Sequence, residues 1–145
     1  MKSKILSYFI IFLFIFFLSL VVYFIIILPS YYSYVAMCNV DKLPDNVEIL
    51  GRASPKIVKD INGNKTIKVD ISIVNGMIDN RTLKHELCHK SQLERRNILL
   101  SCNYPIKTIL LEIECNTMEL FNDKLFEDLY NFNISEEKEK VRVLN

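Results

Sequence analysis

The strongest chemical signal in this sequence is a pair of histidines with a glutamate between them. His85 and His89 are the only two histidines of the chain, and Glu86 follows the first in the run His-Glu-Leu-Cys-His. Residues four positions apart share one face of a helix, so both imidazoles can bind one ion, and such nitrogen ligands favour Zn²⁺. Glu86 lies one step around the helix, where its carboxylate can accept a proton from a zinc-activated water as the general base.

A catalytic zinc site needs a third protein ligand, and the chain has no third histidine to supply it. A glutamate must therefore serve, and the next predicted helix offers Glu112 and Glu114 in the run Glu-Ile-Glu-Cys-Asn. Positions two apart on a helix are separated by about 200°, so only one of these carboxylates can face the metal. This argument leaves both Glu112 and Glu114 as candidates for the third ligand.

The histidine motif and the glutamate-bearing segment together resemble the gluzincin family of zinc metallopeptidases. In that family an H-E-x-x-H helix is followed by a second helix with an E-x-x-A/S-D or E-x-E-A-N pattern. The two motifs, His-Glu-Leu-x-His and Glu-x-Glu-x-Asn, are similar to those of short metallopeptidases of phages and mobile elements that cleave repressors. They are also similar to those of membrane-bound gluzincins such as the antibiotic-sensor peptidases. The resemblance spans roughly residues 82–120, under a third of the chain.

This resemblance implies a zinc-dependent enzyme that hydrolyses peptide bonds, and it assigns further roles. Glu112 matches the third ligand, and Asn116 matches the residue that holds a ligating histidine by its ring N–H. Because Glu112 and Asn116 share a helix face, we favour Glu112 over Glu114 as the ligand. Asparagine stands here for the usual aspartate and Cys115 for the usual small residue. Asparagine orients an imidazole less firmly than a carboxylate does, which predicts low activity.

Peptide hydrolysis also needs a donor for the oxyanion that develops in the transition state. Tyr104, Tyr130, Arg95 and Arg96 are the available side chains. Tyr104 is nearest to the turn between the two predicted helices and is the weak candidate for this role, although packing is the stronger interpretation of this residue.

Four cysteines, Cys38, Cys88, Cys102 and Cys115, lie beyond the N-terminal apolar segment. An even number permits two disulfides in an oxidising compartment, in any of three pairings, and four thiols are the alternative. A Cys88–Cys115 bridge can join the two predicted helices, but we favour buried thiols, because free cysteine packs as a small apolar residue.

The N-terminal segment Ile5–Leu28 is apolar and carries no charge. As a helix it would be roughly 36 Å long, enough to cross a hydrocarbon core of about 30 Å. A secretory signal peptide has a shorter apolar region and a small-x-small cleavage site, which this sequence lacks. We therefore expect an uncleaved signal anchor. Lys2 and Lys4 precede it, so the positive-inside rule predicts a single-pass protein with a cytoplasmic N-terminus and a non-cytoplasmic C-terminal domain.

The next elements are predicted to form a β-hairpin. Ile67–Ile73 alternates apolar and polar residues, which is typical of a strand with one wet face. Lys56–Ile61 is the expected partner strand, and Asn62-Gly63 favours a two-residue type I′ turn between them. Val47–Leu50 is a possible third strand. An exposed strand edge could hold an extended peptide substrate by main-chain pairing, or the hairpin could simply cover the helices.

Two helices are expected after the hairpin. Asp79 or Asn80 can cap a helix through residues 81–97, and Pro105 suits the first turn of a second helix that continues to residue 132. The predicted fold class is α+β, in which the hairpin packs on the H-E-x-x-H helix and a second ligand-bearing helix in a zincin-like domain. The expected boundaries are 1–4 cytoplasmic, 5–28 transmembrane, 29–46 tether, 47–134 metallopeptidase domain and 135–145 frayed charged tail.

The charge balance restricts the partners. The chain has 18 basic and 17 acidic residues and a formal net charge of +1, so it has no electrostatic footprint for nucleic acid. The expected partners are the membrane lipid bilayer and a peptide or protein substrate. A catalytically inactive zinc-binding or interaction protein, anchored in the membrane, is the alternative function. Basic residues of the first helix are expected to face solvent, namely Lys84, Lys90, Arg95 and Arg96.

Overall fold

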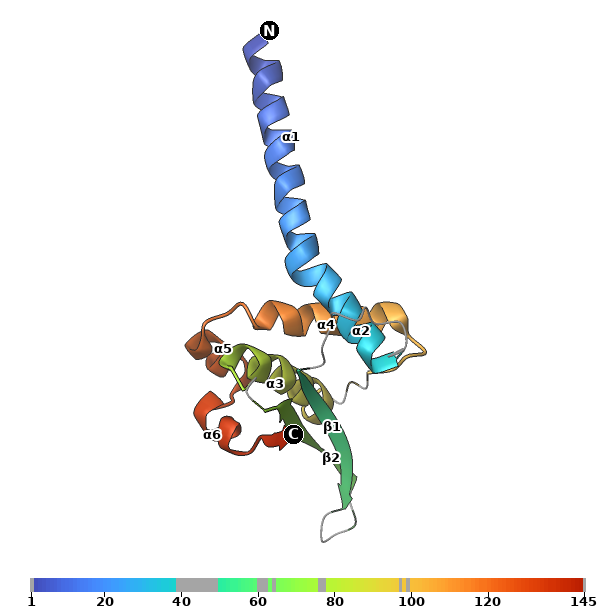
Figure 1. Cartoon of the computed structure of the whole chain (residues 1–145). Coiled ribbons are helices and arrows are strands. Elements are labelled where there is room, and N and C mark those ends of the chain that lie inside the picture. Colours follow the sequence, from blue (N-terminus) through green and yellow to red (C-terminus); the bar gives the residue numbers. More distant parts are fainter. Residues whose placement is uncertain are drawn as a thin grey trace.

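A long N-terminal helix projects from a small α+β domain, as Figure 1 shows. The computed structural model describes residues 2–38, 50–59, 63, 65–75, 78–96, 98 and 100–144, without the side chains of 2–5 and 144. The predicted fold class, α+β with an apolar N-terminal helix, is confirmed at this level.

The N-terminal helix comprises α1 (Lys2–Val22), a π-helical turn η1 (Tyr23–Ile27) and α2 (Leu28–Cys38). Its 33-residue stretch Leu6–Cys38 is long and apolar enough to cross a membrane. Residues 29–38 of the expected tether are helical, and residues 39–46 lie outside the described part of the chain. Pro29 does not end the helix, because the π turn just before it accommodates the missing backbone N–H.

The hairpin consists of β1 (Gly51–Lys59) and β2 (Lys65–Val74), which pair antiparallel. Lys59 pairs with Lys65, so the connection is longer than the two-residue turn expected at Asn62-Gly63. The expected strand Val47–Leu50 falls mostly on undescribed residues, but the Leu50 carbonyl accepts a hydrogen bond from the Val74 N–H at 2.9 Å.

Two helices carry the motif residues. The helix α3 (Asn80–Glu94) begins at Asp79, whose carboxylate accepts a hydrogen bond from the Thr82 N–H at 2.6 Å. The helix α4 (Pro105–Met118) begins at the expected proline. The expected continuation to residue 132 is wrong. The Asn122 side chain caps a separate helix α5 (Asp123–Tyr130), because it accepts a hydrogen bond from a backbone N–H in the first turn of that helix.

The C-terminal residues form structure that the sequence analysis did not predict. Instead of a frayed tail, the chain forms α6 (Ile134–Glu139) and then β3 (Arg142–Leu144). The strand β3 pairs parallel with Ser72–Val74, which makes a three-stranded sheet of order β1-β2-β3. The side chain of Ile134 is 4% exposed and belongs to the core, so apolar burial holds this segment on the domain.

The helix α3 lies at the centre of the domain, where it contacts the sheet, α4, α5 and α6 (Figure 1). Burial on several sides shields Lys84 and Lys90 from solvent, so the expected solvated basic face is wrong for these two lysines. Arg95 and Arg96, just after the end of α3, are exposed as expected. The Lys84 ammonium donates to the Phe121 carbonyl and lies 3.1 Å from Asp123. Lys90 lies 2.6 Å from Glu137. The principal core residues, from β2, α3, α4, α5 and α6, are Ile71, Ile73, Leu83, Leu87, Cys88, Cys115, Phe126, Tyr130 and Ile134.

Two disulfides connect these elements. Cys38 at the end of α2 is bonded to Cys102 in the loop before α4, and Cys88 of α3 is bonded to Cys115 of α4. The expectation of buried thiols is therefore wrong. Cys88 and Cys115 are fully buried, as expected for thiols, but they face each other where α3 packs on α4, which the sequence did not reveal.

Candidate metal centre

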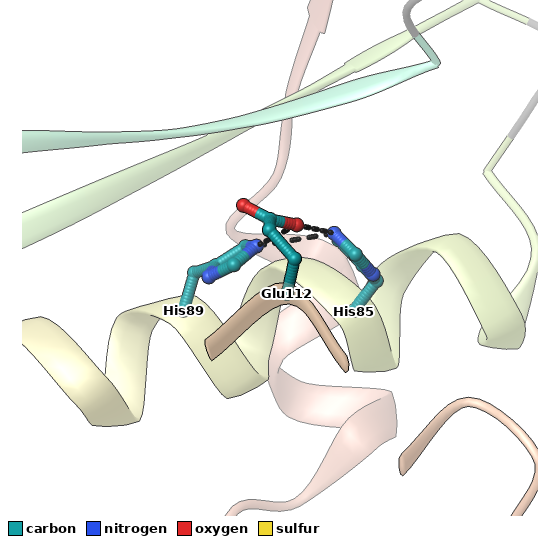
Figure 2. A group of neighbouring side chains, drawn as sticks. All are labelled: His85, His89 and Glu112. Carbon is teal, nitrogen blue, oxygen red and sulfur yellow. Dashed lines mark hydrogen bonds and ion pairs between the residues drawn. The ribbon is translucent and has the colours of Figure 1, made fainter. Parts of the chain in front are cut away.

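Three side chains converge between α3 and α4. His85 and His89 lie one turn apart on α3, with 3.1 Å between their Nε2 atoms. Glu112 of α4 places Oε2 3.5 Å from His85 Nε2 and 3.3 Å from His89 Nε2. Figure 2 shows the carboxylate lying above the two rings. The three donor atoms lie within 4.8 Å of one another, so this group could hold a metal ion.

The burial of Glu112 bears on what the site can bind. Its side chain is only 4% exposed, and Oε2 has no hydrogen-bond partner among the described residues. The two imidazole nitrogens lie near this oxygen but make no well-directed hydrogen bond to it, which is costly for a buried carboxylate. A cation bound by the oxygen and the two nitrogens would remove that cost. The donor set therefore fits a metal ion with two nitrogen ligands and one oxygen ligand.

The electrostatics favour positive charge at the same place. Burial alone lowers the pKa of His85, but the carboxylates of Glu112 and Glu119 outweigh burial and raise it to about 10. Burial alone raises the pKa of Glu112, but the two neighbouring imidazoles lower it to about 2. The carboxylates thus stabilise a cation at the histidines, either a proton or a metal ion, and the two compete.

Glu86, the expected general base, lies beside the cluster and is 5% exposed. Burial raises the pKa of its carboxyl, which makes it a better proton acceptor near neutral pH. The backbone of Gly51, at the start of β1, lies directly against this carboxyl. A Cβ atom added at Gly51 would be 2.7 Å from Glu86 Oε1, so only glycine fits there without displacing Glu86.

Asn116 does not orient a histidine, and that expectation is wrong. Its amide donates hydrogen bonds to the Ser30 hydroxyl at 2.9 Å and to the Glu112 carbonyl at 3.0 Å. Glu112 and Asn116 lie one turn apart on the same side of α4, but the Glu112 carboxylate contacts the histidines of α3, whereas the Asn116 amide contacts Ser30 of α2. Asn116 therefore fastens the N-terminal helix to α4 behind the ligand.

Two residues that the sequence analysis missed contact the outer ring nitrogens. Glu119 Oε1 lies 2.8 Å from His85 Nδ1, and Gln92 Oε1 lies 3.0 Å from His89 Nδ1. The Gln92 hydrogen bond orients the His89 ring and leaves its Nε2 for an ion. The Glu119 carboxylate contacts His85 Nδ1 as an ion pair, without the geometry of a hydrogen bond. The signal was present for both, because Glu119 is seven positions after Glu112 and Gln92 is three positions after His89, on shared helix faces.

Glu114, the alternative ligand, faces away from the cluster. It accepts hydrogen bonds from the Tyr130 hydroxyl at 2.8 Å and from the Gln92 amide at 3.2 Å, and it forms an ion pair with Arg96. The structure thus brings Glu112, and not Glu114, to the histidines. Tyr130 and Arg96 are occupied by the same contacts.

The other two oxyanion candidates, Arg95 and Tyr104, also receive no support from the structure. Arg95 donates to the carbonyl of Tyr130 and to that of Asn131. Tyr104 precedes the first residue of α4 and is 67% exposed. It is roughly 12 Å along the helix axis from Glu112, so its position gives the oxyanion role no support.

The Cys88–Cys115 disulfide lies next to the cluster. It joins the helix of the two histidines to the helix of Glu112, and Cys115 Sγ lies 3.5 Å from His89 Nδ1. A covalent bond therefore sets the distance between the two ligand-bearing helices.

Comparison of the chain with protein-family models, with curated proteins and with solved structures finds no match. The class is therefore stated from fold and site alone. The chain is an α+β protein with an apolar N-terminal helix and a buried group of two histidines and a glutamate that could hold a metal ion.

Proposed function

We propose that this protein is a membrane-anchored zinc-dependent metallopeptidase. The observation that carries the proposal is the convergence of His85, His89 and Glu112 on one point, with Glu86 beside them. Two imidazoles and one carboxylate are the ligand set of a catalytic zinc site, which keeps its fourth position for water or substrate.

The residues would divide the work as follows. A bound Zn²⁺ would acidify a water molecule and polarise the carbonyl of the scissile peptide bond. Glu86 would accept the proton of that water and pass it to the leaving amine, a role for which its burial and raised pKa suit it. Glu119 and Gln92 would hold the two imidazoles by their outer nitrogens, so that both rings keep Nε2 toward the ion.

The apolar helix would place this chemistry at a membrane surface. Residues 5–28 would span the bilayer with the N-terminus in the cytoplasm and the domain on the other side. The two disulfides support that orientation, because such bonds persist in oxidising compartments outside the cytoplasm. The substrate would then be a peptide or protein segment near the non-cytoplasmic face.

The test uses the full chain in lipid nanodiscs, with metal content measured by mass spectrometry and cleavage measured on a mixed peptide library. We expect about one zinc per chain, lost in a His85→Ala, His89→Ala double variant. Glu86→Gln should keep the zinc and lose cleavage, because it removes the proton acceptor and no ligand. Glu139→Gln, on the exposed face of α6, is the matched control and should change neither. A wild-type chain that takes up no zinc would refute the proposal.

One observation favours the alternative, a zinc-binding protein without catalysis. The side chains of His85, His89 and Glu112 are only 13%, 6% and 4% exposed, and structural zinc sites are closed in this way. Zinc in the wild-type chain together with no cleavage of any peptide, and no difference between wild type and Glu86→Gln, would establish this alternative.

A further inference from the structure

The helix α4 has an apolar face that the domain does not bury. Its inner side carries Glu112 and Cys115, which are 3% and 0% exposed. On the opposite side, Ile106 and Leu110 are 75% and 60% exposed. With the half-buried Ile113 they recur at helical spacing and form one stripe along the helix. An exposed apolar stripe of this kind marks a contact surface.

The position of α4 in the molecule indicates what this stripe contacts. Of the domain helices and strands, α4 lies nearest to α1 in Figure 1, where it crosses α2 just beyond the end of α1. It packs on α2 and touches η1. The Asn116 amide donates to the buried Ser30 hydroxyl at 2.9 Å, and the Cys38–Cys102 disulfide ties the end of α2 to the loop before α4. These contacts hold α4 at a fixed height on the apolar helix.

That height corresponds to the surface of a bilayer. A hydrocarbon core of about 30 Å takes about 20 helical residues, so a span that begins at Leu6 ends within η1, the turn that α4 touches. Three tyrosines on the elements that meet here are exposed: Tyr23 of η1 by 45%, Tyr31 of α2 by 49%, and Tyr104, just before α4, by 67%. Tyrosine is enriched where a membrane protein crosses the lipid–water interface.

We propose that the outer face of α4 rests on the lipid bilayer, with Ile106 and Leu110 inserted among the headgroups and upper acyl chains. The inference rests on the membrane anchoring in the proposed function and is independent of zinc and of catalysis. The occupant is lipid because α4 is fastened to a helix that lipid itself surrounds, so the apolar surface of the span continues onto the stripe. Lys107, at the side of the stripe, can extend its ammonium to the headgroups.

This arrangement has a consequence for the candidate site. Glu112 lies on the inner side of the same helix whose outer side contacts the bilayer. The metal-binding group would therefore sit one helix diameter, about 10 Å, from the headgroups and at a constant height. Peptide segments that emerge directly from the membrane could reach it, whereas sites far from the surface on a large folded protein could not.

The test places a fluorophore on the stripe of the full chain. The sequence contains no tryptophan, so Leu110→Trp introduces a unique probe, and Ile106→Trp is a second probe on the same face. Leu13→Trp reports the middle of the span, and Ile57→Trp, at a residue 72% exposed on β1, reports water. Each variant is reconstituted in phosphatidylcholine vesicles with and without brominated acyl chains, which quench only tryptophans in contact with lipid.

We expect brominated lipid to reduce the fluorescence of Leu110→Trp, Ile106→Trp and Leu13→Trp, and to leave Ile57→Trp unchanged. The aqueous quencher acrylamide should quench Ile57→Trp most strongly and Leu13→Trp least. Stripe probes that behave like Ile57→Trp, while Leu13→Trp is quenched by lipid, would overturn the contact and leave the anchor intact. Stripe probes shielded from both quenchers would mean that protein covers the face, which also overturns it. A Leu13→Trp that lipid does not quench would refute the anchor and the contact together, but not the zinc site.

Discussion

Opposite charges meet at two places in this molecule, and their surroundings differ. One place is the contact between α3 and α4, and the other is the exposed β1–β2 hairpin. On the hairpin, Lys56 pairs with Asp70, and their side chains are 61% and 49% exposed. Between the helices, Glu112 is 4% exposed and its Oε2 lies 3.5 Å from Nε2 of His85, whose pKa is raised to about 10 by the neighbouring carboxylates against the effect of burial. Water and salt screen the first pair, whereas the second group has lost its solvation and depends on its partners. A pair of opposite charges can therefore be dispensable on the surface and decisive in the interior, and packing determines which of the two it is.

The largest effect should come from the buried ligand. Replacing Glu112 by Gln removes the negative charge that two imidazoles face, so we expect zinc to fall from about one per chain to almost none. Metal content after dialysis measures this. Glu114→Gln is the matched control two positions away, and it should keep the metal, because that residue contacts Arg96, Tyr130 and Gln92. Equal loss in both variants would contradict the assignment of Glu112.

The second effect concerns the covalent bond between the ligand-bearing helices. A Cys88→Ala, Cys115→Ala double variant should lower the free energy of unfolding by about 2–4 kcal/mol, the usual contribution of a disulfide. It should also weaken zinc binding, because the distance between α3 and α4 is no longer fixed. Denaturant unfolding and competition with a zinc chelator measure the two quantities. Unchanged zinc affinity in the double variant would show that packing alone positions Glu112.

The third effect concerns the outer ring nitrogens. We expect Glu119→Gln to reduce zinc affinity about 10- to 100-fold, because it weakens the carboxylate partner of His85 Nδ1. Asn116→Ala should reduce it much less, because that amide contacts Ser30 and the Glu112 carbonyl and no imidazole. Chelator competition on both variants gives the comparison. The reverse order would restore Asn116 to the role expected from the family pattern.

The fourth effect, of similar size but on the rate and not on zinc affinity, is expected where β1 meets the candidate base. Gly51→Ala should push the Glu86 carboxyl aside and reduce kcat/KM about 10- to 100-fold with zinc retained, because small misplacements of catalytic groups cost rate. Arg52→Ala, at the next and exposed position of β1, serves as the control and should leave kcat/KM near the wild-type value. Metal content and peptide cleavage are measured on the same samples.

The smallest effect should come from the exposed pair. The Lys56 ammonium lowers the pKa of Asp70 below its ordinary value of 3.8. A lowered carboxyl pKa stabilises the fold above about pH 4, and this contribution disappears as the pH falls through the folded pKa. Because the pair is exposed, we expect Lys56→Ala to leave Tm unchanged at pH 7 and to raise the pKa of Asp70 in an NMR titration. A clear fall in Tm would contradict the contrast with the buried group.

Local patterns predicted several elements of this fold correctly. Alternation at Ile67–Ile73 identified β2, Asp79 identified the start of α3, and Pro105 identified the start of α4. The spacing of His85, Glu86 and His89 identified the candidate site. Each of these signals depends on neighbours within about seven residues, so the chain itself carries them.

Such local patterns did not predict the contacts between residues distant in the sequence. The helix expected to continue to residue 132 ends at Met118, and the tail expected to fray supplies β3 through pairing with residues 72–74. The basic residues of α3 meet partners on α4, α5 and α6, so a helix that looked solvated is central. No local pattern encodes which helix will cover another.

The sequence by itself determined the apolar helix, the hairpin, the two ligand-bearing helices and the pair of histidines, because propensity and periodicity act over a few residues. The tertiary structure alone decided that Cys88 meets Cys115, that Glu119 and Gln92 contact the imidazoles, and that Gly51 lies against Glu86. It also decided that α4 carries a ligand on one face and an exposed apolar stripe on the other. Those outcomes depend on how surfaces distant in sequence fit together, and burial sets that only when the whole domain packs.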